Sequence, residues 1–181
     1  MKRTQDQPIG TLLTLADAQA QLRLPSDNGD DAFVTGLIAA AIAHAEVAMA
    51  CSLLTRSVTA TFYSGENLYL PRGPVQDITS VTVNGTTIDP SAYSTEQYGH
   101  GVLLRINNGT IQPYAAPATI EVTYDAGYGE ADDVPADIIA AIKAHVALLY
   151  ENREVAGDRT IKPVPFLEDF YRLRALDVGV G

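Results

Sequence analysis

Residues 78–88 read Ile-Thr-Ser-Val-Thr-Val-Asn-Gly-Thr-Thr-Ile, two runs rich in β-branched residues on either side of Asn84-Gly85. An Asn-Gly pair in this setting is the strongest short-range hairpin signal, because both residues of the tight turn need positive φ. The same composition, with Gly, Pro and Asn between short runs of Thr, Val, Tyr and Ile, extends from Leu54 to Asp125. The sequence therefore predicts an antiparallel module of five to seven short strands.

Helices are predicted on both sides of this module. Apolar residues recur at three-to-four spacing through residues 31–52 and 135–154, which is the pattern of helices that bury one face. Shorter helices are predicted at 15–23 and at 166–176. The first of these begins after Thr14, which with Asp17 has the spacing of a capping box.

The predicted fold class is therefore α+β, with a helical bundle body and an inserted antiparallel β module. We expect the whole chain, residues 1–181, to form a single domain. Its predicted parts are a helical body (residues 12–54 and 130–155), a β insertion (residues 55–126) and a C-terminal tail (residues 156–181).

Composition excludes several classes of protein. The chain of 181 residues is 46% apolar and 19% charged, which is typical of one folded domain. Twelve Lys and Arg against 22 Asp and Glu give a formal charge of −10, which disfavours a sequence-independent hold on nucleic-acid phosphates. Cys51 is the single cysteine, so no internal disulfide is possible. The sequence contains no run of 18 consecutive apolar residues, so it predicts no membrane span.

Catalytic patterns are equally lacking in the sequence. The three histidines, His44, His100 and His145, have no metal-ligand spacing, and no Gly-x-Ser-x-Gly elbow is present. Cys51 lies near the end of an apolar helix, where a buried unreactive thiol is expected. We therefore predict no catalytic, cofactor-binding or metal-ligating residues, and a small hydrolase is the least favoured alternative. The tyrosine-rich β module leaves open a protein that binds a glycan or another surface ligand.

Four segments occur in a specific order along the chain: Leu70-Pro71-Arg72-Gly73-Pro74-Val75, Ala126-Gly127-Tyr128-Gly129, Val134-Pro135 and Tyr150-Glu151-Asn152-Arg153-Glu154. In this order they resemble the head-tail connector proteins of long-tailed bacteriophages and gene transfer agents, also called adaptor or head-completion proteins. The resemblance covers residues 12 to 175.

The resemblance implies a structural virion protein that is not an enzyme and needs no cofactor. Its members form a dodecameric ring between the portal and the stopper or tail, as part of the DNA exit channel. The implied partners are other copies of the chain, the portal protein and a stopper or tail-completion protein, with DNA passing through without specific binding and no membrane involved. The expected location is the virion neck, after synthesis in the bacterial host cytoplasm. Another neck ring protein, such as a stopper or tail terminator, remains an alternative.

Two sets of residues are candidates for contacts in such an assembly. Glu151, Arg153 and Glu154, at the end of the predicted helix 135–154, are candidates for the subunit interface, because an arginine can form a forked contact with a carboxylate. The C-terminal tail is expected to dock on the portal, since aromatic and basic residues follow a proline-containing arm. The docking candidates are Phe166, Phe170, Tyr171, Arg172 and Arg174.

Overall fold

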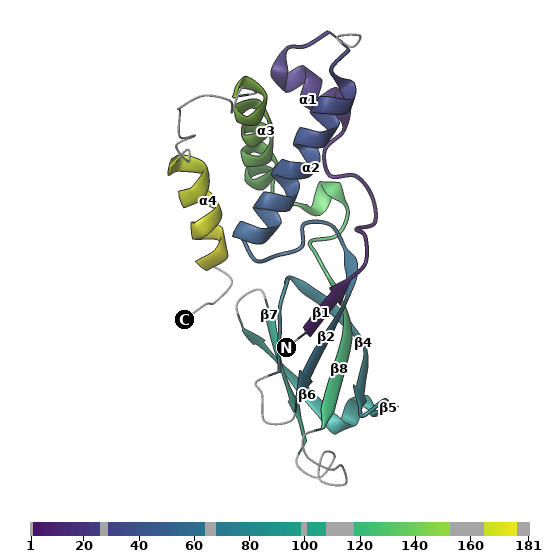
Figure 1. Cartoon of the computed structure of the whole chain (residues 1–181). Coiled ribbons are helices and arrows are strands. Elements are labelled where there is room, and N and C mark those ends of the chain that lie inside the picture. The colour runs from purple at the N-terminus through teal and green to yellow at the C-terminus, as the bar shows by residue number, and fades with distance from the viewer. Residues whose placement is uncertain are drawn as a thin grey trace.

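The computed structural model describes residues 2–25, 29–63, 68–98, 101–107, 118–152 and 165–176. Figure 1 shows an elongated molecule with the helices in one half and the strands in the other. The chain begins among the strands, crosses to the helices, returns to the strands and crosses back again. This arrangement confirms the predicted α+β class.

Two antiparallel sheets make up the strand half. The larger has the order β1-β2-β8-β4-β5 and the smaller has the order β3-β7-β6. β8 lies at the centre of the larger sheet and pairs with β2 along its whole length. The strands are β1 (Lys2–Gln5), β2 (Arg56–Tyr63), β3 (Leu68–Leu70), β4 (Val75–Val83), β5 (Thr86–Thr87), β6 (Tyr93–Tyr98), β7 (Gly101–Ile106) and β8 (Thr119–Ala126).

The predicted hairpin joins β4 to β5. Asn84 and Gly85 have φ angles of 50° and 79°, both positive, as the tight turn requires. Val83 pairs directly with Thr86 across the turn. The side-chain oxygen of Asn84 also accepts a hydrogen bond of 2.8 Å from the backbone N–H of Thr119, which ties the turn to the start of β8. The hairpin is thus confirmed.

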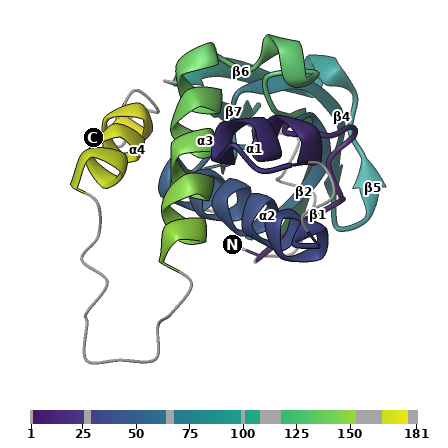
Figure 2. The same ribbon diagram turned by 90° about the horizontal axis from the view of Figure 1, so that it is seen from above.

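Four helices form the other half of the described chain: α1 (Leu15–Leu22), α2 (Asp31–Ala48), α3 (Ala136–Glu151) and α4 (Pro165–Leu176). The view from above shows α4 beside α3, on the side away from α1 (Figure 2). Thr14 caps α1 as predicted: its hydroxyl accepts a hydrogen bond of 3.1 Å from the Asp17 N–H, and the Asp17 carboxylate accepts one from the Thr14 N–H. The capping box is therefore present.

The second helix is shorter than the predicted 31–52, because α2 ends at Ala48. Ala50 has a φ of 52°, in the left-handed region, which stops the helix. The backbone of Cys51 then pairs with that of Arg72 in an isolated parallel β-bridge. The sequence does not reveal this stop. The residues that follow the helix are buried as well, so the apolar pattern continues past Ala48.

Helix α2 is also long and apolar enough, by length and composition alone, to cross a membrane. Core helices of folded domains pass the same test, and α2 contacts the other three helices here. Only five of its 18 residues are buried within the chain: Val34, Ile38, Ala41, Ala45 and Glu46.

The buried apolar side chains form two separate clusters. One consists of residues from the helices and from the segments next to them, and includes Leu167 and Tyr171 of α4. The other consists of residues from β2, β3, β4, β7 and β8 together with Ala118. On this basis we propose that the helical body and the β insertion are two halves of one domain, and that α4 packs as part of the helical body.

Candidate functional site

Three of the four segments that carry the family resemblance, residues 70–75, 126–129 and 134–135, meet at the junction between the two halves. The chain passes from α2 to β2 through residues 49–55 and from β8 to α3 through residues 127–135, while the loop 71–74 between β3 and β4 lies against both. Backbone hydrogen bonds join the three connections: Ser52 N–H to Gly73 O at 3.3 Å, Gly127 N–H to Pro74 O at 2.9 Å, and Tyr128 N–H to Leu53 O at 3.1 Å. Segments distant in sequence thus form one continuous structure.

A buried ion pair lies at the centre of this junction. Glu46 at the end of α2 and Arg56 at the start of β2 are 7% and 6% exposed. One Glu46 carboxylate oxygen accepts hydrogen bonds from the Arg56 guanidinium at 2.5 Å and from the Leu53 N–H at 3.0 Å. A buried charge is costly unless it is paired and hydrogen-bonded, so each partner requires the other.

Arg72 completes the junction from the loop between β3 and β4. Its guanidinium donates hydrogen bonds to the backbone oxygens of Glu46 at 2.8 Å and Cys51 at 3.0 Å. The Glu46 oxygen also accepts a hydrogen bond of 3.1 Å from the Cys51 N–H, so Arg72 is its second donor at the end of α2. Burial, and after it the positive charge of Arg3, lowers the pKa of Arg72. Nearby, the Tyr124 hydroxyl donates to Pro71 O, and burial raises its pKa.

Gly127 allows the closest approach of two backbones in the junction. Its φ of 140° is in a region that favours glycine, and a Cβ there would lie 2.6 Å from the backbone of Leu54. The amide of Gln76 donates a hydrogen bond of 3.0 Å to Gly127 O. The Ala-Gly-Tyr-Gly segment therefore serves close packing.

The contacts at the junction hold the two halves of the chain together. Burial raises the pKa of the Cys51 thiol to about 12, with the Glu46 carboxylate as the second cause, so the thiolate that a nucleophile requires is rare at neutral pH. The thiol is 3% exposed, as the sequence predicts. Among the residues that the structure describes, no group of three or more His, Cys, Asp or Glu side chains could hold a metal ion.

Of the three predicted subunit-interface residues, only Glu151 belongs to the described part of the chain. Glu151 is the last residue of α3 and is exposed. Arg153 and Glu154 lie outside the described residues. The role of this group stays a prediction.

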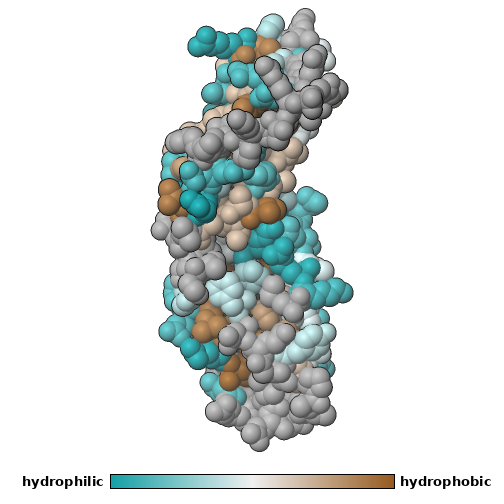
Figure 3. Space-filling view, turned by 60° about the vertical axis from the view of Figure 1, so that its left-hand side comes forward, coloured by the Kyte–Doolittle hydropathy of each residue, from teal (hydrophilic) through white to brown (hydrophobic). Residues whose placement is uncertain are grey.

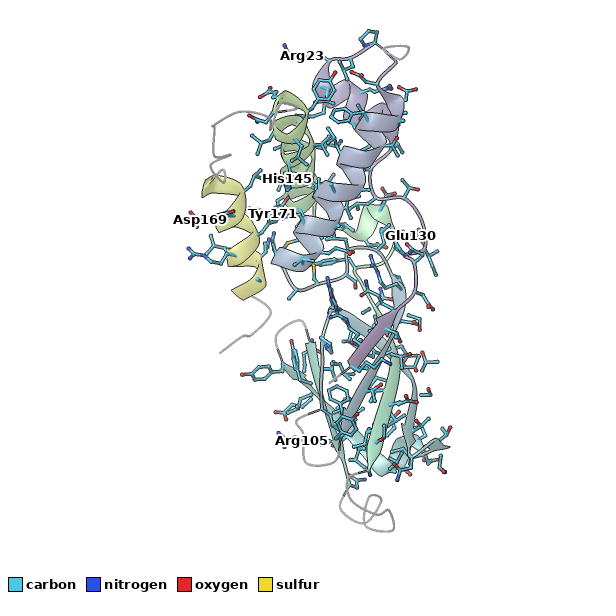
Figure 4. The ribbon with its side chains drawn as sticks, in the orientation of Figure 1. Arg23, Arg105, Glu130, His145, Asp169 and Tyr171 are labelled. Atoms are coloured by element: carbon cyan, nitrogen blue, oxygen red, sulfur yellow. The ribbon has the colours of Figure 1, made fainter. Side chains whose placement is uncertain are left out.

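The predicted docking residues are divided between the surface and the core. Tyr171 is fully buried, with its ring centroid 5.9 Å from that of His44 and 6.1 Å from that of His145. Figure 4 shows Tyr171 directed from α4 toward His145. The ring is thus enclosed by the helical body of its own chain, and a docking role for Tyr171 stays a prediction. Burial also raises its pKa to about 12.

The other docking candidates lie on α4 as follows. Phe170 is half-buried, and Arg172 is exposed and forms an ion pair of 3.1 Å with Asp169. Arg174 forms an ion pair with Asp137 of α3. The Arg174 side chain lowers the pKa of the Asp137 carboxyl group. Phe166 belongs to α4, and its side chain lies outside the described part.

Sequence reasoning assigned no role to Glu46 and Arg72, although Arg72 occurs in one of the segments that resemble the connector proteins. A signal for Glu46 was available. Residues 32–45 contain no Asp, Glu, Lys or Arg, so a single carboxylate following fourteen uncharged residues points to a buried partner. For Arg72 the position between a proline and a glycine was the corresponding signal, because it places the side chain in a tight loop.

The fold and the junction together define an α+β structural protein of two halves. Its buried charged side chains, Glu46 and Arg56, pair with each other where the halves join. The chain belongs to the head completion protein family, because the model of that family, described as "head completion protein", matches residues 11–162. This family is one of structural virion proteins, which confirms the resemblance seen in the sequence. No curated protein sequence matches the chain.

Solved structures with the same fold come from gene transfer agent (GTA) particles. A chain in the virion of a native GTA particle has a TM-score of 0.72 and 22% identity. A chain in the neck of an empty particle, computed with C6 symmetry, has 0.73 and 23%, and one in the neck of a native particle, computed with C12 symmetry, has 0.72 and 21%. In each comparison 95% of both chains is covered.

Proposed function

We propose that this protein is a ring-forming adaptor in the neck of a bacteriophage or gene transfer agent particle. Copies of the chain form a dodecamer between the portal and the stopper or tail, and DNA passes through the ring without specific binding. The observation that carries the proposal is the family match over residues 11–162. The similarity in fold to GTA neck chains, over 95% of both chains, supports the same location.

The charge of the chain suits a channel for DNA. With a formal charge of −10 per copy, twelve copies form a strongly acidic ring. Acidic walls repel phosphates, so a duplex passes without adhering. A protein that retained DNA would need the opposite sign of charge.

We assign contact with the portal to the C-terminal tail of the chain, residues 156–181. With Tyr171 in the core, Arg172 and the half-exposed Phe170 remain for contact with the portal, together with the exposed Leu173 next to them. The α4 surface that they form is a small one. The rest of the predicted docking tail, residues 156–164 and 177–181, lies outside the described part of the chain.

Deletion of the gene in a strain that produces particles tests the proposal. We expect DNA-filled heads without tails in negative-stain electron microscopy, and tailed particles again when the wild-type gene is supplied in trans. Normal tailed particles in the deletion strain would show that the chain is not a neck component. Heads that fail to fill with DNA would indicate a role before neck assembly and would also contradict the proposal.

A further inference from the structure

The exposed side of α2 is mostly apolar, and the exposed polar residues of the helix before Glu46 are Asp31, Thr35 and His44. Gly36, Ala40 and Ala43 are exposed, and the larger side chains Phe33 and Val47 at its two ends are 41% and 68% exposed. No charged residue occurs from position 32 to position 45. A helix that is apolar on all sides is normally covered on all sides, whereas α1, α3 and α4 cover only one side of this one. Figure 3 shows pale and dark brown surface along the helical half of the molecule.

A hollow adjoins this apolar side. It has a volume of about 320 Å³ and lies between the segment 8–15 and α2, where Thr35, Ala39 and Ile42 form one wall. Buried Glu46 and Arg56 lie at its margin, paired with each other. The rest of the lining is nearly all apolar, so the hollow suits an apolar side chain from outside.

A second surface, whose exposed middle residues Ala140 and Ala144 are uncharged, lies on the opposite side of the α2–α3 pair, and the exposed Asp137 and Glu151 lie toward its two ends. The α3 residues Ile138, Ile142 and Val146 are buried, and one helical half-turn away Ala136, Ala140 and Ala144 are exposed. The two charged side chains in the middle and first turn of α3 are engaged elsewhere: Lys143 with Asp17 of α1, and Asp137 with Arg174 of α4. Glu151, the predicted interface residue, ends this exposed side of α3.

We propose that the exposed side of α2 binds the exposed side of α3 in the next copy of this chain, as the repeating contact of the ring. The inference rests on the proposed ring function. A closed ring needs two different surfaces on opposite sides of each copy, which these are. Each copy carries a net charge of −10, so close contact between copies favours surfaces without charge. The small residues on both helices permit the backbones to approach closely.

Chemical crosslinking of assembled particles tests the contact. In a Cys51→Ser background, Ala43→Cys and Ala144→Cys are combined in one chain, and particles are treated with a flexible bismaleimide. Because the two cysteines lie on opposite sides of the helix pair, head-to-tail contact predicts a ladder of multimers on a denaturing gel, up to the dodecamer. Each single-cysteine variant should stay largely monomeric. Dimers from Ala43→Cys alone would reveal an α2–α2 contact and overturn the inference.

Charge variants provide an independent measurement on the full chain. Ala40→Glu and Ala144→Glu should each reduce incorporation into heads at least about tenfold, because a charge in a desolvated contact lacks a partner. Ala20→Glu, the same change at an exposed position of α1, should stay within about twofold of wild type. Circular dichroism must show that all three variants fold; normal incorporation of the first two would then refute the contact.

The two proposals fail in different ways. Deletion of the gene can abolish tails while the paired cysteines give no ladder of multimers and the charge variants enter heads normally. In that case the adaptor function stands and the α2–α3 contact is wrong. If wild-type chain instead floats with phosphatidylcholine vesicles in a density gradient, lipid covers α2 and the contact is again wrong.

Discussion

Replacing Glu46 by glutamine removes the negative charge from the centre of the junction. The amide oxygen can still accept the hydrogen bond from Leu53, but the Arg56 guanidinium, 6% exposed, loses its counter-charge. Breaking a buried ion pair from one side costs about 3–5 kcal/mol, since the remaining charge is left desolvated and unpaired. We therefore expect Glu46→Gln to lower the free energy of unfolding by that amount.

Urea unfolding followed by circular dichroism at 222 nm measures the loss. With an m-value of about 2 kcal/mol/M, the midpoint should fall by about 1.5–2.5 M. Glu96→Gln is the matched control, because Glu96 forms an ion pair of 3.2 Å with Arg105 in which both side chains are more than 60% exposed. An exposed pair contributes about 0–1 kcal/mol, so this midpoint should move little.

A double variant separates the ion pair from simple loss of packing. Glu46→Gln combined with Arg56→Met replaces the buried charge with an apolar side chain of similar length, and we expect most of the lost stability to return. If the double variant is as unstable as the sum of the two single variants, or if Glu46→Gln alone changes the midpoint no more than Glu96→Gln, then the reasoning about the buried pair is wrong.

Three further predictions follow from single residues. Cys51 in the folded chain should react with a disulfide reagent about 10³-fold more slowly than in denaturant, because burial raises its thiol pKa from 9.0 to about 12; rapid native labelling would contradict this. Gly127→Ala should lower the melting temperature by several degrees through its clash with Leu54, whereas Gly36→Ala, with open space around the new methyl group, should stabilise α2 by about 0.5–1 kcal/mol. Burial, and then the charge of His44, lowers the pKa of His145 below 6.5, so its contribution to stability is present above that pH and is lost as the pH falls through the folded value. The drop in melting temperature from about pH 7.5 to about pH 5 should therefore be smaller in His145→Leu; an equal drop would assign it to other groups.

Much of the fold could be predicted because local signals are strong at particular residues. Asn84-Gly85 specifies a turn that few other pairs adopt, and Thr14 with Asp17 specifies a helix start. The strand β1 could not be predicted in this way. Its residues Lys2–Gln5 are all polar and exposed, and pairing with β2 rather than any pattern of its own makes it a strand.

The candidate site was less accessible to sequence reasoning, because its contacts are distant along the chain. Arg72 lies 26 residues from Glu46, and no periodicity reports that its guanidinium reaches the end of α2. Tyr171 looked like a surface residue in a tail with arginines. The structure buries it in the cluster between the helices, where its ring lies near those of His44 of α2 and His145 of α3.

The hydrogen bonds at the junction also bear on how the molecule responds to force. The chain crosses between the two halves at residues 49–55 and 127–135, and backbone hydrogen bonds join these crossings to each other and to the loop 71–74. Two crossings that are bonded together resist bending more than one flexible tether would, so we expect the two halves of each copy to keep their relative orientation under load.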